Sequence, residues 1–129
     1  MPHILIIDDD HLVAAATKAV LGSKGYDVSV VSNGQDGIAA VRNAKFDLVI
    51  VDLFMPGMDG LKVIQAIREG DGKVPMIAAS GFMFGGGECP TMPNFDAMAA
   101  EAGAKLTLYK PFKPDVLMRT VEKALAEAA

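Results

Sequence analysis

The chain has 129 residues, a net charge of −4 and 51% hydrophobic residues, which suits one domain with one core and is too short for two. The acidic balance argues against direct binding to nucleic acid or to an anionic membrane. The single cysteine, Cys89, excludes an internal disulfide. With no apolar run of bilayer length, the sequence predicts a cytoplasmic protein.

Strand-like and helix-like segments alternate along the whole chain. Short apolar runs predict strands at residues 3–8, 26–31, 46–51, 75–80 and 106–109. The first helix is predicted from His11 to Ser23 and is expected to bury Leu12, Val13, Ala16 and Val20. The fourth helix carries an apolar stripe formed by Phe95, Met98, Ala99 and Ala102. This alternation predicts an α/β fold, with a parallel sheet covered by helices on both faces.

Carboxylates follow two of the predicted strands. Asp8, Asp9 and Asp10 come after the first strand, and Asp52 comes after the third. The carboxyl ends of parallel strands meet at one edge of a sheet, and carboxylates that close together repel unless a cation lies among them. The sequence therefore predicts a hard-metal site at this edge, with one carboxylate left free for chemistry. Asp10 is expected to cap the following helix.

Two further polar side chains lie at the ends of later strands. Ser80 closes the fourth strand and Lys110 follows the fifth. Taken singly, they are typical of a turn serine and a solvated surface lysine. Together with the carboxylates they place an acid pair, a lone acid, a hydroxyl and an ammonium at one sheet edge, which is a set suited to phosphoryl transfer.

The chain resembles the receiver domain of two-component response regulators in the segments ILIIDDD, DLVIVDLFMPGMDG, PMIAAS and YKPF. The resemblance covers residues 2–125 and implies a doubly wound, flavodoxin-like sheet of five parallel strands in the order 2-1-3-4-5. It implies that Asp52 is the phosphoacceptor and receives its phosphoryl group from a histidine kinase or a phosphotransfer protein. Ser80 and Lys110 would each contact a phosphoryl oxygen.

The same resemblance implies a metal cofactor, Mg²⁺ or Mn²⁺. Asp9 and Asp52 would bind the ion directly, the backbone carbonyl of Phe54 would be a third ligand, and Asp8 would act through water. Mg²⁺ prefers oxygen ligands, with one or two carboxylates and retained waters, so these residue types suit it.

Two features depart from the family pattern. The switch aromatic is expected three residues before the lysine, where this chain has Thr107, and Tyr109 would share the same strand face. The connection from Ser80 to Lys110 is longer than usual, and residues 81–94 are interpreted as a lid or a partner-contacting loop. Bulky side chains at Phe54 and Phe82 are expected to slow attack of water on a phosphorylated aspartate.

Residues 1–129 are expected to form a single receiver domain with no output domain, acting as a phosphoacceptor switch and not as a conventional enzyme. Its downstream protein partner would bind through the fourth helix, the fifth strand and the fifth helix, and signalling would proceed by conformational change or phosphorelay. Three alternatives compete with this interpretation. The chain could be a receiver domain excised from a larger regulator or hybrid kinase. A hydrolase of the haloacid dehalogenase type would need a second acid where this chain has Phe54. A flavodoxin-like flavin carrier would not place Asp8, Asp9 and Asp10 in its first loop.

Overall fold

The computed structural model describes residues 1–55, 58–80, 95–110 and 112–128. Five parallel strands form one sheet in the order β2-β1-β3-β6-β7. They are β1 (His3–Ile7), β2 (Asp27–Val31), β3 (Leu48–Asp52), β6 (Met76–Ser80) and β7 (Leu106–Tyr109). The predicted fold class and strand order are confirmed. A short antiparallel pair, β4 (Phe54–Met55) and β5 (Met58–Asp59), lies outside this sheet and was not predicted.

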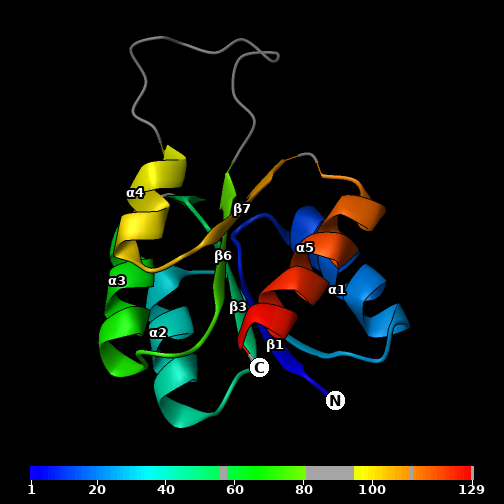
Figure 1. Ribbon diagram of the computed structural model, residues 1–129, viewed down its shortest axis with the longest axis horizontal. Coiled ribbons are helices and arrows are strands. Elements are labelled where there is room, and N and C mark those ends of the chain that lie inside the picture. The colour runs from blue at the N-terminus through cyan, green and yellow to red at the C-terminus, as the bar shows by residue number, and fades with distance from the viewer. Residues whose placement is uncertain (56–57, 81–94, 111, 129) are drawn as a thin grey trace, which may run out of the picture.

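The described part of the chain forms five helices, which cover the two faces of the sheet (Figure 1). The helices α1 (His11–Ser23) and α5 (Pro114–Ala128) lie on one face. On the other face lie α2 (Gly34–Asn43), α3 (Gly60–Gly70) and α4 (Phe95–Ala102). Each face has its own apolar cluster, because the side chains of a strand alternate between its two faces. The central strand β3 is buried along its whole length, as expected for a strand covered on both sides.

Among the described residues, three helices begin at side chains that cap them. Asp10 accepts hydrogen bonds from the backbone N–H groups of the first turn of α1, at 3.0 and 3.2 Å. Asn33 does the same for α2, at 2.7 Å, and Asp59 for α3, at 2.9 Å. Such a cap satisfies an N–H that has no partner within the helix and is worth about 1 kcal/mol. The predicted capping role of Asp10 is confirmed.

The predicted buried face of α1 is only partly right. Val13 and Val20 are half-buried, but Leu12 is 84% exposed and Ala16 is exposed, and the residues that the structure buries are Ala14, Thr17 and Leu21. The hydrophobic pattern did not predict that Thr17 is buried, because threonine is classed as polar. Its hydroxyl donates to the carbonyl of Val13 at 2.7 Å, so it is satisfied within the helix and can be buried.

The apolar stripe predicted for α4 is partly wrong as well. Ala99 and Ala102 are buried, but Met98 is 39% exposed. Ala99 and Ala102 belong to the apolar cluster on this face of the sheet, and the side chain of Phe95 lies outside the described part of the structure. Among the helices that the structure describes, none is long and apolar enough to cross a membrane.

Candidate functional site

Three carboxylates gather where β1 and β3 end. Asp8 and Asp9 directly follow β1, and Asp52 is the last residue of β3. One carboxylate oxygen from each of the three lies within 4.8 Å of the other two. Asp8 and Asp52 are each only 4% exposed, and Asp9 is half-buried. The structure thus brings together the acids that the sequence predicted to meet at this edge.

Lys110 lies between the two buried carboxylates. Its Nζ donates to Oδ2 of Asp8 at 2.7 Å and to Oδ2 of Asp52 at 3.2 Å. The lysine side chain is 15% exposed and both carboxylates are 5% exposed, so water screens these ion pairs much less than it screens a surface pair. One ammonium therefore partly compensates two buried negative charges.

The second oxygen of each buried carboxylate is held by the main chain. Oδ1 of Asp8 accepts the N–H of Asp10 at 2.9 Å, and Oδ1 of Asp52 accepts the N–H of Phe54 at 3.0 Å. Each carboxylate is thus fixed by a backbone donor on one oxygen and by Lys110 on the other. This pairing sets the orientation of both groups, because charge-assisted hydrogen bonds are short and directional.

The electrostatics of the site follow from burial and from the ion pairs. Burial raises the pKa of Asp8 above its usual value, although the hydrogen bond and charge of Lys110 and the N–H of Asp10 act in the opposite direction. Burial alone would lower the pKa of Lys110. The hydrogen bond to Asp8 and the charges of Asp52 and Asp8 outweigh that effect, so the pKa of Lys110 is raised and the lysine is charged at neutral pH.

Gly60 is a position that the sequence analysis missed. A Cβ atom there would lie 2.5 Å from Cα of Leu53 and 2.6 Å from the carbonyl oxygen of Asp52. Both are backbone atoms, so neither can move without displacing the end of β3. The absence of a side chain lets the first turn of α3 pack directly against the backbone of Asp52. The sequence signal that could have indicated this position is a glycine directly after a helix-capping aspartate, Asp59-Gly60, because a glycine there allows the helix to lie against a neighbouring backbone.

The other predicted site residues lie on β6, β7 and β4 or outside the described residues. Ser80 ends β6, where it is paired in register with Tyr109 of β7, and its side chain is outside the described part of the structure. Thr107 is half-buried and Tyr109 is 52% exposed. Phe54 is half-buried in β4. The roles of these residues stay predictions, and residues 81–94, with Phe82 and Cys89, are outside the described residues.

The acid cluster suits a hard divalent cation by its donor chemistry. Three carboxylates contribute oxygen ligands within a small space, and oxygen is the ligand atom that Mg²⁺ and Mn²⁺ prefer. The site has no cysteine or histidine among these residues, so a softer metal has less reason to bind.

Comparison with known proteins gives a consistent result. The family model for the response regulator receiver domain matches residues 4–122. The DNA-binding response regulator MtrA of Mycolicibacterium paratuberculosis is 34% identical over 122 residues, which cover 95% of this chain and 50% of that protein. The transcriptional regulatory protein ZraR of Salmonella typhimurium is 34% identical over 123 residues, which cover 95% of this chain and 26% of that protein. The chain therefore spans half or less of these relatives.

Solved structures match over nearly the full chain. A CheY-like response regulator receiver domain protein from Methanospirillum hungatei has a TM-score of 0.88 and 25% identity, and the match covers 99% of this chain and 96% of that one. The chemotaxis protein CheY4 of Vibrio cholerae has a TM-score of 0.83 and 26% identity, over 96% and 98% of the two chains. With its strand order, its acid cluster and the family match over residues 4–122, the chain belongs to the response regulator receiver domains of two-component systems.

Proposed function

We propose that this receiver domain accepts a phosphoryl group on Asp52 from a histidine kinase or a phosphotransfer protein, in a reaction that needs a divalent cation. The observation that carries this proposal is the setting of the Asp52 carboxylate. It is buried at the end of β3, lies among the cluster with Asp8 and Asp9, and is held by Lys110 and by the N–H of Phe54. A carboxylate held in one orientation supports a role as the nucleophile.

The proposed step is a transfer between two nucleophiles. A carboxylate oxygen of Asp52 forms a bond to phosphorus while the phosphorus–nitrogen bond of a phosphohistidine breaks, and the imidazole leaves with the bonding electron pair. An acyl phosphate results. Charge on the transferring group is the main obstacle in such reactions, so positioning and neutralisation supply most of the catalysis. The domain assists its own phosphorylation and dephosphorylation and is otherwise a switch.

Neutralisation is proposed to come from the metal and from Lys110. Mg²⁺ or Mn²⁺ would be held by Asp9, Asp52 and the carbonyl of Phe54, with Asp8 acting through water, and would offset negative charge on the phosphoryl oxygens. Lys110 already donates to Oδ2 of Asp52. We propose that the same ammonium would contact a phosphoryl oxygen attached to Asp52. Ser80 is proposed as a further hydrogen-bond donor.

Output is proposed to pass through a protein partner that contacts α4, β7 and α5. The relatives named above are DNA-binding or transcriptional regulators as whole proteins, and we propose no direct DNA contact for the receiver domain itself. The single-domain organisation and the alternative of a receiver domain from a longer regulator both stay predictions, as does a cytoplasmic location. Family membership leaves the hydrolase and flavodoxin interpretations without support.

Phosphorylation by acetyl phosphate with Mg²⁺ tests the proposal directly. Mass spectrometry should show one added phosphoryl group on the wild-type protein and on Asp27→Asn, an exposed aspartate on β2 that serves as the matched control. Asp52→Asn should show none, and chelation of the metal should abolish uptake in every variant. Normal uptake by Asp52→Asn would overturn the assignment of the acceptor.

A further inference from the structure

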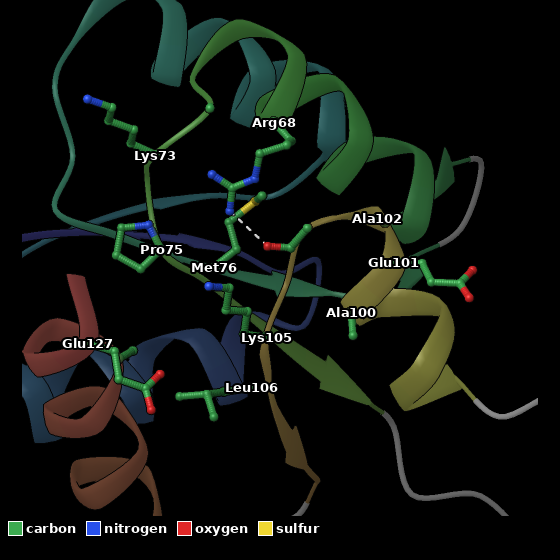
Figure 2. Close-up of a pocket in the computed structure, with 13 residues that line it drawn as sticks. Arg68, Lys73, Pro75, Met76, Ala100, Glu101, Ala102, Lys105, Leu106 and Glu127 are labelled. Carbon is green, nitrogen blue, oxygen red and sulfur yellow. Dashed lines mark hydrogen bonds between the residues drawn. The ribbon is translucent and has the colours of Figure 1, made fainter.

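A cavity of about 500 Å³ opens at the edge of the sheet opposite to Asp52. It lies where β6 and β7 begin and where α3, α4 and α5 end, as Figure 2 shows. Parallel strands place their amino ends at one edge and their carboxyl ends at the other, so this cavity is separated from the acid cluster by the length of the sheet. Its volume is within the range of small-molecule sites.

The charged side chains that line the cavity leave it with an excess of one positive charge. They are Arg68, Lys73, Lys105, Glu101 and Glu127. Among the described residues, none of these five belongs to an ion pair. In Figure 2 the carboxylate of Glu101 points away from Arg68 and Lys105. The lining therefore keeps a formal charge of +1, with no close ion pair among its described side chains, and suits an anionic ligand of low charge.

Arg68 is the most firmly positioned of these cations. Its Nη2 donates to the carbonyl of Gly103 at 2.8 Å, and its Nη1 donates to the carbonyl of Asp71 at 3.3 Å. A guanidinium has five N–H donors in a fixed plane, and these two bonds hold that plane while occupying only part of its capacity. A carboxylate can pair with donors of such a fork.

Apolar side chains lie beside the cations. Pro75 and Leu106 are half-buried, and with Met76, which is 2% exposed, they form the wall at the start of β6 and β7. A bare inorganic anion would leave the exposed parts of Pro75 and Leu106 in contact with water. A ligand with an apolar body would cover them and gain free energy in proportion to the area removed from water.

We propose that this cavity binds a small monocarboxylate with an apolar body, such as an aromatic or short aliphatic acid. Its carboxylate pairs with Arg68 and Lys105, and its apolar part contacts the wall formed by Pro75, Met76 and Leu106. The charge excess of one favours a monocarboxylate over a phosphate ester, which carries close to two negative charges at neutral pH. The proposal is independent of phosphoryl transfer at Asp52.

A ligand bound to Arg68 would also affect the turn that follows α4. Gly103 has a φ of +136°, and a Cβ atom there would lie 2.8 Å from Nε of Arg68. The arginine thus packs against the turn between α4 and β7 and hydrogen-bonds its carbonyl. A carboxylate that draws on the same guanidinium changes the environment of this turn, so the amide of Gly103 should report binding.

Backbone amide NMR with benzoate as the probe tests the proposal at constant ionic strength. We expect saturable shifts at Met76, Gly103 and Leu106. Benzyl alcohol, the neutral analogue, should bind at least threefold more weakly. Asp52→Asn should bind benzoate as the wild type does, which separates this site from the phosphoacceptor.

Three variants complete the experiment. Lys105→Met should weaken benzoate binding about threefold to fivefold, as expected for an exposed ion pair, and Arg68→Met should weaken it about tenfold or more. Lys123→Met removes an exposed lysine on α5 that does not line the cavity and should leave affinity unchanged. Shifts that do not saturate, or equal losses in Lys105→Met and Lys123→Met, would overturn the proposal. Lys105 makes no hydrogen bond from its side chain to described residues, so its variant stays informative even if Arg68→Met fails to fold.

Discussion

Replacing Lys110 by methionine tests how the buried acids are stabilised. Coulomb's law with an effective dielectric constant of about 20 gives each ion pair a gross attraction of about 5–6 kcal/mol at 2.7 and 3.2 Å. Desolvation of the three groups offsets most of this gain, but removing one partner leaves the carboxylates of Asp8 and Asp52 buried without a cation. Loss of a buried partner typically costs about 3–5 kcal/mol. We expect Lys110→Met to lower the free energy of unfolding by about 3 kcal/mol, a large part of the ~5–15 kcal/mol of an ordinary domain.

Urea unfolding with and without Mg²⁺ measures this cost. A divalent cation bound only by the folded state stabilises it by about 2.7 kcal/mol at a hundred times its Kd, and it should bind more tightly when Lys110 no longer competes for the same oxygens. Mg²⁺ should therefore stabilise Lys110→Met more than the wild type and reduce the difference between them. Lys113→Met, an exposed lysine before α5, is the matched control. Equal stability of Lys110→Met and wild type in chelator, or a difference that Mg²⁺ does not change, would refute the reasoning.

Three further outcomes follow from the site. Burial raises the pKa of Asp8, so the folded state retains its proton more strongly than the unfolded chain and loses stability as pH rises from about 3.9 through the folded pKa. The stability of Asp8→Asn relative to wild type should accordingly increase with pH over this range, which urea titrations at several pH values would measure; a constant difference would contradict it. Gly60→Ala should cost about 1–3 kcal/mol, because its Cβ would meet backbone atoms at 2.5 and 2.6 Å. It should also slow phosphorylation by acetyl phosphate, and uptake at the wild-type rate would show that the approach of α3 does not position Asp52. Phosphorylated protein should decay slowly, and the double substitution Phe54→Ala with Phe82→Ala should hasten the decay if these side chains hinder water; an unchanged half-life would exclude that role.

The site could be predicted from the sequence because its polar residues lie at the carboxyl ends of strands. Asp8, Asp9, Asp52 and Lys110 are far apart in the chain, yet in a parallel sheet every strand that follows a right-handed crossover ends at the same edge. The meeting of the acids at one edge could therefore be predicted from the alternation of strands and helices, whereas the strand order came from the resemblance to receiver domains. The same argument gave no distances, and it did not predict that the ammonium of Lys110 bridges both buried carboxylates.

What the sequence could not supply were features set by contacts between elements. Thr17 is buried through a hydrogen bond to its own helix, so polarity alone did not place it on the buried face of α1. The close approach of Gly60 to the backbone of Asp52 depends on how α3 packs against β3, and no local pattern states that distance. The cavity beside Arg68 is formed by five separate elements, and its lining residues share no motif.

Because Lys110 bridges the two buried carboxylates, the formal charge of the pocket would best match a divalent ion. Three carboxylates against one ammonium leave a net charge of −2. A divalent ion brings this set to neutrality, whereas Na⁺ or K⁺ would leave one negative charge facing an incoming phosphoryl anion, and a trivalent ion would leave one positive charge. The charge of Lys110 would thereby favour a divalent ion, and the oxygen ligands would favour a hard one. A substitution that kept every carboxylate but removed this lysine would shift the preference toward ions of higher charge.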